Sequence, residues 1–227
     1  FINPKQFAEN EDLTSYPANL NQDLKLLENL NVDCVFAPKK EELYLEHHSI
    51  YLIENSLSKY LEGASRPKFF SGVITIVSKL FNICQPTDVF FGEKDGQQLI
   101  IIKKLIQDLN YNIICHDIPV IRNEEGLALS SRNEYLNNEQ LNIASNIYMS
   151  LCLIQKKIAA GERNVTLLKE LFKQSIHDFP DLTIDYFSIA DINTLEEISG
   201  NIQSTVLIST AILLNEIRLI DNIKYII

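Results

Sequence analysis

Apolar positions in the first half of the chain alternate between helical spacing and short continuous runs. Apolar residues recur every three or four positions in Leu20–Leu30 and Phe70–Ile83, which predicts two amphipathic helices. A shorter helix is expected near Ser56–Leu61. Strand-like runs separate these segments, at residues 1–3, 32–38, 50–53, 89–91 and 111–115. Strands alternating with helices at these lengths indicate a parallel sheet with helical crossovers.

The pattern changes beyond Pro119. A loop leads to a long helix, expected from about Asn138 to Ala160, with Gly161 as the C′ residue that ends it. A second helix is expected at 165–177. Three strand-like segments follow, at 183–189, 205–214 and 216–220. Helices followed by consecutive strands are typical of an α+β unit with an antiparallel sheet, so we expect two domains, 1–117 and 118–227.

Charge and composition exclude several classes of protein. The 227 residues carry a net charge of −10, which argues against a nucleic-acid-binding surface. No apolar run approaches the roughly 20 residues that span a bilayer, and Phe1 is not followed by a signal-peptide pattern. The four cysteines lack the spacing of metal or redox motifs, so we expect buried thiols in a reducing compartment and no metal site. They are Cys34, Cys84, Cys115 and Cys152.

The run from Asp88 to Leu105 is the strongest candidate for a binding site. It predicts a strand, a turn at Gly92, and a helix with Leu99, Ile102, Ile106 and Leu109 facing inward. Free backbone N–H groups and the helix dipole make such a helix start an anion site. Lys94 adds a positive charge there, and Asp95, Gln97 and Gln98 add directional polar groups. The alternative is a solvated helix start with Asp95 as its cap.

Three other polar clusters each have a functional and a structural interpretation. Asn3–Phe7 presents Gln6 in a turn, or is a plain β-turn. Arg66, in Glu62–Pro67, could reach a carboxylate or phosphate, or be simply solvated. The serines and Arg132 of Gly126–Asn133 form either a phosphate clamp or an N-cap for the next helix.

Taken together, Lys94 and Arg132 suggest a site for a polyanionic nucleotide. No G-x-G-x-x-G or Walker A sequence is present, so neither hydride transfer nor P-loop hydrolysis is supported. The chain also lacks a Ser/His/Asp order and a plausible cysteine nucleophile.

Seven motifs in order resemble the pantothenate synthetase (pantoate–β-alanine ligase) family. They are NPKQF, LEGASRP, VSKLFNICQP, FGEKDGQQ, GLALSSRN, GER and RLIDN, and they cover residues 1 to about 222. The resemblance implies a Rossmann-like nucleotidyltransferase domain (1–117) with a smaller C-terminal α+β lid domain (118–227). It also implies a cytoplasmic homodimer that uses ATP and Mg²⁺ to adenylate pantoate. β-Alanine then displaces AMP to give pantothenate, a coenzyme A precursor.

Matching motifs carry the family's site residues onto this chain. The ATP site would contain Gly92, Glu93, Lys94, Asp95, Ile121, Leu129, Ser130, Ser131 and Arg132. Among these, Lys94, Arg132, Ser130 and Ser131 would neutralise charge during catalysis. Gln6 and Gln98 would hold pantoate, with Asn3 and Arg66 nearby, and Gln6 would also contact β-alanine.

The chain departs from the family pattern in three places. The family's upstream P-T-M-G-A-L-H-x-G-H segment, which supplies the proton-donor histidine, is missing. We therefore expect an N-terminally truncated chain that is inactive on its own. The segment Arg66–Val73 lacks a usual glycine and histidine, and Gly96 replaces a common aromatic. Two alternatives stay open: an enzyme that adenylates another carboxylate, and a non-catalytic remnant that binds nucleotide or forms dimers.

Overall fold

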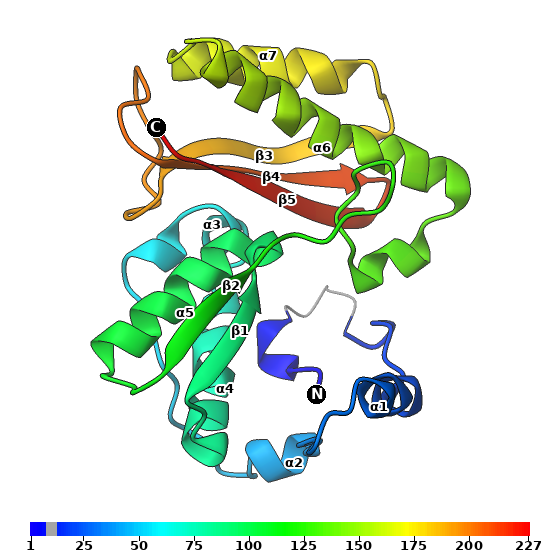
Figure 1. Ribbon diagram of the computed structural model, residues 1–227, viewed down its shortest axis with the longest axis vertical. Helices are drawn as coiled ribbons and strands as arrows, with labels where there is room; N and C mark the ends of the chain where they lie inside the picture. The colour runs from blue at the N-terminus through cyan, green and yellow to red at the C-terminus, as the bar shows by residue number, and fades with distance from the viewer. Residues whose placement is uncertain (8–12) are drawn as a thin grey trace. The chain divides into compact units, whose positions relative to one another are not determined.

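The computed structural model describes residues 1–7 and 13–227, which form two compact units. The first unit comprises residues 1–53 and 68–85, and the second comprises 54–67 and 86–227. The expected α/β fold with one parallel sheet and a separate antiparallel sheet is confirmed, and both sheets lie in the second unit (Figure 1). The domain boundary between residues 117 and 118 remains a prediction.

Helix α4 is the centre of the first unit. It spans Phe69–Cys84 and is buried around most of its circumference, beyond the single apolar face that the sequence predicts. The short helix η1, Pro4–Gln6, packs on it at Gly72, where an added Cβ would lie 2.2 Å from the Lys5 carbonyl oxygen. Only glycine allows the two backbones to approach so closely. Helices α1, Leu20–Asn29, and α2, Lys40–Leu43, complete the regular elements of this unit.

The strands expected at residues 1–3, 32–38 and 50–53 are not present, and those predictions are wrong. A strand requires a hydrogen-bonded neighbour, and none of the described strands pairs with these runs. Residues 50–53 lie against α4 instead. The Leu52 N–H donates to Thr75 Oγ1 at 2.9 Å, and the Ser71 hydroxyl donates to the Leu52 carbonyl oxygen at 2.7 Å. Side chains of α4 thus supply the hydrogen-bond partners that a neighbouring strand would otherwise provide for this backbone.

The parallel pair in the second unit consists of β1, Asp88–Gly92, and β2, Ile114–Ile118. Their connection is helix α5, Gly96–Asp108. The sequence placed β2 three residues too early. The Tyr111 N–H still bonds to the Ile106 carbonyl oxygen at 3.0 Å, after a turn in which Asn110 has a φ of 54°, so this segment still belongs to the helix end.

The inward face of α5 is formed by Leu99, Ile101, Ile102 and Leu105. Leu99 and Ile102 were expected there, but Leu109 follows the end of the helix and is 48% exposed. The helix expected at 56–61 is split into η2, Leu57–Lys59, and α3, Glu62–Ser65. Leu61, with a φ of 51°, interrupts it because that conformation cannot continue a right-handed helix.

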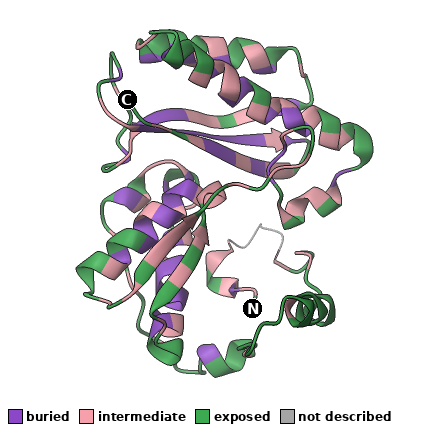
Figure 2. Ribbon diagram, in the orientation of Figure 1, coloured by how far each residue is buried: buried purple, intermediate pink, exposed green. Residues whose placement is uncertain are grey.

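The antiparallel sheet has the order β3-β4-β5 and supplies the main core. Its strands are β3, Leu182–Asp191, β4, Val206–Leu214, and β5, Ile217–Tyr225. Helices α6, Asn138–Ala159, and α7, Val165–His177, cover one face of it (Figure 1). These elements confirm the expected helices and strands, including Gly161 after α6 with a φ of 103°, but the strand expected at 216–220 continues to Tyr225. Figure 2 shows β4 buried along most of its length, whereas α1 is largely exposed.

The cysteines are unpaired but less buried than expected. Cys34 and Cys84 are exposed, and Cys115 and Cys152 are half-buried. Cys84 is the last residue of α4, and Cys34 lies in the irregular segment that was predicted as a strand. Within residues 1–7 and 13–227, no helix has both the length and the apolar character needed to cross a membrane.

Candidate functional site

The turn after β1 carries the predicted nucleotide-binding residues. Gly92 ends the strand opposite Ile118 of β2, so the carboxyl ends of the two parallel strands are level. The single-turn helix η3, Glu93–Asp95, follows at that edge, where open α/β sheets bind ligands. Lys94 is partly buried, with its Nζ atom 3.4 Å from Asp95 Oδ1. Asp95 holds the N-cap position of α5 without a side-chain cap bond, so it pairs with the lysine rather than capping.

Asn222 of β5 fixes the backbone of this turn. Its Nδ2 atom donates to the carbonyl oxygens of Glu93 and Lys94, at 3.0 Å and 2.7 Å. Asn222 is buried, so these bonds are shielded from water. Gly96 leaves room for this amide, because a Cβ there would lie 2.8 Å from Asn222 Oδ1. The first helical turn of α5 therefore rests directly on the antiparallel sheet.

The two glutamines at the start of α5 have different surroundings. Gln97 is buried, and its amide nitrogen donates to the carbonyl oxygens of Leu57 and Tyr60 at 2.9 Å and 2.8 Å. Its Oε1 accepts from the Glu62 N–H at 2.9 Å. Gln97 thus holds the segment before Arg66 and does not line an open site. Gln98, the predicted pantoate residue, is half-buried on the same turn.

The Glu62–Arg66 turn is held by a buried carboxylate. Arg66 is half-buried, with its Nη1 atom 3.9 Å from Glu62 Oε2. Glu62 is only 6% exposed and accepts two bonds from Arg218 of β5, at 2.6 Å and 2.9 Å. Asp185 of β3 accepts from the same guanidinium at 2.7 Å and 3.0 Å. This planar fork is the geometry in which arginine binds carboxylates best.

Burial and charge shift the pKa values in this network. Burial opposes the charge of Arg218, but the hydrogen bonds and charges of Glu62 and Asp185 outweigh it and raise its pKa. Burial, reinforced by the charge of Glu62, raises the pKa of Tyr186 far above its usual value. The arginine therefore stays charged and the tyrosine neutral at any physiological pH.

The loop from Ile121 to Arg132 is a small hairpin with two exposed apolar side chains. Arg122 and Ala128 form an antiparallel bridge, and the Leu129 N–H bonds to the Ile121 carbonyl oxygen at 2.9 Å. Ile121 is 62% exposed and Leu129 is 52% exposed. The hairpin therefore presents an apolar edge, and its contact with the nucleotide stays a prediction.

The hydroxyl and guanidinium groups follow this edge. Ser130 caps η4, Ser131–Tyr135, by accepting from the Arg132 N–H at 3.3 Å. The N-cap interpretation of this motif is thus realised for Ser130. Ser131 is exposed and Arg132 is half-buried, so both hydroxyls and the cation lie on one short turn. The phosphate role of Ser131 and Arg132 stays a prediction.

Arg122 was not identified from the sequence as a site residue. Its guanidinium donates to Asp221 of β5 at 2.6 Å and 2.9 Å and to the Gly126 carbonyl oxygen at 3.1 Å. It also lies over the Tyr148 ring, 3.6 Å from the centroid. Its place beside Ile121 was the only signal in the sequence, since the partner carboxylate lies 99 residues away. Arg122 ties the hairpin to the sheet.

Asn3 and Gln6 lie together in the first unit, on and next to η1. Asn3 is 4% exposed, and its Nδ2 atom donates to the Gly72 carbonyl oxygen at 3.0 Å. Its Oδ1 atom accepts from the Tyr44 hydroxyl at 3.0 Å, and burial raises the pKa of that tyrosine to about 12. Asn3 therefore fixes η1, which carries the half-buried Gln6. A substrate contact for either residue stays a prediction.

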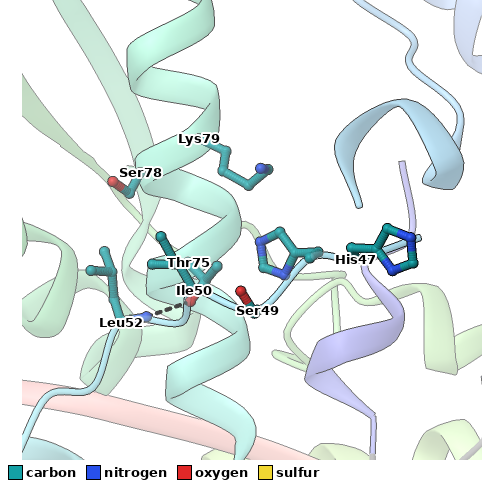
Figure 3. A pocket seen from close by; sticks show the side chains of 8 residues that line it. His47, Ser49, Ile50, Leu52, Thr75, Ser78 and Lys79 are labelled. Carbon is teal, nitrogen blue, oxygen red and sulfur yellow. Dashed lines mark hydrogen bonds between the residues drawn. The ribbon is translucent and has the colours of Figure 1, made fainter. Parts of the chain in front are cut away.

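A hollow of about 380 Å³ also lies in the first unit, beside α4. Figure 3 shows Lys79, Ser78 and Thr75 of α4 on one side of it and His47 on the other. None of the residues predicted to bind ATP or pantoate lines this hollow. In the described part of the chain, no three His, Cys, Asp or Glu residues cluster as metal ligands would.

Comparison with known proteins gives consistent matches over almost the whole chain. The family model for pantoate-beta-alanine ligase matches residues 1–224. A pantothenate synthetase from Fervidobacterium nodosum is 46% identical over 98% of this chain and 79% of its own length. The crystal structure of the pantothenate synthetase from Thermus thermophilus superimposes with a TM-score of 0.94 at 36% identity, covering 99% of this chain and 81% of that one.

A further solved structure carries ligands. The pantoate-beta-alanine ligase of Francisella tularensis, complexed with beta-gamma ATP and beta-alanine, has a TM-score of 0.76 to this chain. The two are 30% identical, and the match covers 99% of this chain and 77% of the other. These likenesses confirm the nucleotidyltransferase-like fold expected from the sequence.

Proposed function

The chain belongs to the pantoate–β-alanine ligase family, and on that premise we propose that it condenses pantoate with β-alanine in an ATP-dependent reaction. The reaction proceeds through a pantoyl-adenylate intermediate and releases AMP and pyrophosphate. The observation that carries the proposal is the family match over residues 1–224. The Francisella tularensis relative, solved with an ATP analogue and β-alanine, supports the same two ligands for this chain.

The first step needs charge neutralisation more than a protein nucleophile. The pantoate carboxylate attacks the α-phosphorus of ATP, and the bond to the departing pyrophosphate breaks. Lys94 lies at the carboxyl edge of the parallel sheet, where it can reach the phosphates. Arg132 and the hydroxyls of Ser130 and Ser131 supply further donors from η4. Fixed donors of this kind stabilise the negative charge that develops in the transition state.

The second step is an aminolysis. The amine of β-alanine attacks the acyl carbon of the mixed anhydride, the bond to the AMP oxygen breaks, and pantothenate forms. Alignment of amine and anhydride supplies most of the acceleration. Gln6 and Gln98 are the proposed pantoate contacts, with Asn3 and Arg66 nearby. Gln6 also contacts β-alanine in this proposal.

The family resemblance supports three further proposals. Mg²⁺ accompanies the ATP phosphates, with Glu93 and Asp95 the nearest carboxylates along the chain to Lys94. Magnesium is commonly held by one or two carboxylates together with substrate phosphates, so the lack of a three-residue cluster among the described residues fits this mode. The protein acts as a homodimer in the cytoplasm.

The test is product formation by the protein as its gene encodes it. We expect ATP and pantoate to release pyrophosphate, and added β-alanine to yield pantothenate detected by mass spectrometry. Pantoate should be preferred over other 2-hydroxy acids of similar size. Pyrophosphate release with another carboxylate but not with pantoate would instead favour a different adenylating enzyme. ATP binding without either product would favour a non-catalytic nucleotide-binding protein.

Lys94→Ala tests the phosphate assignment. Loss of a fixed cation at the reacting phosphates should lower the rate of pantoate-dependent pyrophosphate release by about 100-fold or more. Lys104→Ala is the matched control, because Lys104 is exposed on the following helix, α5, and pairs only with Asp108 at 2.8 Å among the ion pairs described. Its rate should stay within about twofold of the wild type. Equal rates for Lys94→Ala and wild type would contradict the assignment.

A further inference from the structure

Three polar residues in one segment of β5 each hold a different turn of the candidate site. The segment runs from Arg218 to Asn222, close to the end of the described chain. Its polar side chains are Arg218, Asp221 and Asn222, and the last two are buried. Buried polar groups on a sheet persist where they are hydrogen-bonded, and here each of the three side chains has a partner in an element outside the sheet.

Asn222 holds the turn that carries Lys94. The two carbonyl oxygens that it binds belong to η3 itself, at Glu93 and Lys94. Because one amide nitrogen donates to both, it fixes the orientation of the peptide groups on either side of the lysine Cα. The direction in which the Lys94 side chain leaves the turn depends on that orientation.

Arg218 holds the turn that carries Arg66. Its two-point bond to Glu62 lies four residues before Arg66, and the Arg66 N–H bonds to the Glu62 carbonyl oxygen at 2.8 Å. Gly63, next to Glu62, has no room for a side chain, since a Cβ there would lie 1.9 Å from the Ser58 carbonyl oxygen. The guanidinium of Arg218 links this turn to the sheet by two short bonds, and the Ser65 hydroxyl adds a longer one to Asp185 of β3 at 3.5 Å.

Asp221 holds the hairpin that presents Ile121 and Leu129. Its carboxylate oxygens accept hydrogen bonds from both terminal nitrogens of Arg122. Its Oδ1 atom also accepts from the Asn222 N–H at 2.7 Å. The Asp221 carboxylate therefore bonds both to Arg122, which belongs to the hairpin, and to the backbone of Asn222, which holds the Lys94 turn.

We infer that Arg218, Asp221 and Asn222 form a positioning strip, which sets the ATP turn, the pantoate turn and the covering hairpin relative to one another. None of the three side chains needs to touch a substrate for this role. The inference rests on the proposed function for the identity of the substrates. It goes beyond that function in assigning separate substrates to separate residues of one strand.

A crossed kinetic experiment tests the strip. Asn222→Asp replaces the donating amide by a carboxylate that cannot donate to the two carbonyl oxygens, at almost unchanged size. Arg218→Lys keeps the charge but loses the two-point bond to Glu62. We expect Asn222→Asp to raise the KM for ATP about tenfold and the KM for pantoate by less than about threefold, because Gln98 follows the Lys94 turn whereas Arg66 lies on the turn that Arg218 holds. Arg218→Lys should do the reverse.

The controls separate positioning from stability and from the proposed function. Asn215→Asp makes the same chemical change at an exposed position of the β4–β5 turn and should alter neither KM. If Arg218→Lys fails to fold by circular dichroism, Asp185→Asn loosens the same guanidinium more mildly and should shift the same KM. Equal changes of both KM values in both variants, or no change in either, would overturn the strip. All variants are made in the protein as its gene encodes it, and an inactive wild type of that protein would instead contradict the proposed function.

Discussion

At the residue scale, His48 has surroundings unlike those of its exposed neighbour His47. Its ring packs edge-on between Tyr44 and Tyr51, with centroids 5.0 Å and 4.9 Å away. Its Nδ1 atom is buried and has no hydrogen-bond partner among the described residues. Burial, with added repulsion from Lys79 and Lys5, lowers the pKa of His48. No local sequence pattern marks this environment, because the tyrosines that enclose His48 are identified by packing alone.

The lowered pKa predicts a pH dependence of stability. The unfolded state takes up a proton near the ordinary pKa of about 6.5, and the folded state does so only at lower pH. His48 therefore favours the folded state above pH 6.5, and that contribution is lost as the pH falls toward the folded-state pKa. In His48→Gln, the melting temperature should fall less between pH 7 and pH 5 than in the wild type. His47→Gln is the control, and an equal effect in both variants would contradict the prediction.

At the element scale, the contact between η1 and α4 depends on Gly72. Gly72→Ala would add about 1 kcal/mol of helix propensity, yet its Cβ would lie 2.2 Å from the Lys5 carbonyl oxygen. Backbone must then shift, so we expect a net destabilisation of about 1–3 kcal/mol in urea unfolding. Asn82→Ala, at an exposed position of the same helix, should change the free energy of unfolding by less than about 0.5 kcal/mol. Similar values for the two variants would refute the close contact.

The elements also differ in whether the local sequence was enough to predict them. Helix α6 was predicted almost to the residue, because its start has a capping box between Asn137 and Gln140 and its end has Gly161. The run at 32–38 has the composition of a strand but none of the described strands pairs with it, and composition does not specify a partner. Prediction succeeded where the determining contacts lie within one turn.

The residues of the candidate site also divide into those with a local sequence signal and those without one. Lys94 and Arg132 could be proposed as candidates because charge at a helix start or in a serine-rich turn is a local signal. The anchoring roles of Gln97, Arg122 and Arg218 could not, since each depends on a partner 35 to 156 residues away. No spacing rule links residues at such separations, so only the fold shows them together.

At the scale of the whole molecule, burial is distributed very unevenly. The side chains packed between α6, α7 and the antiparallel sheet include Ile154, Phe172 and Ile208, each fully buried. Helix α1 has no buried residue, although Leu20 and Leu30 have the spacing of an apolar face. The predicted helix is present at α1, but in the described structure it lacks the tertiary packing that usually stabilises such a helix.

This contrast predicts a gradient of hydrogen exchange. Amides of α1 should exchange much faster than those of α7, a helix of comparable length whose Leu168 and Phe172 are fully buried. Mass spectrometry of peptides from the two helices in the intact protein would measure the difference. Equal protection of α1 and α7 would show that α1 is stabilised by contacts other than those described.

The late position of β5 in the chain has a consequence for synthesis on the ribosome. The Lys94 turn, the Arg66 turn and the hairpin all precede their anchors, by 128, 156 and 99 residues in the hydrogen bonds described. Domains generally begin to fold from the N-terminal side as the chain emerges, but these three turns must wait for residues 218–222. A nascent chain that already contains every predicted ATP contact would still lack the strand that orients them. Competence to bind substrates should therefore appear abruptly, after translation has passed β5.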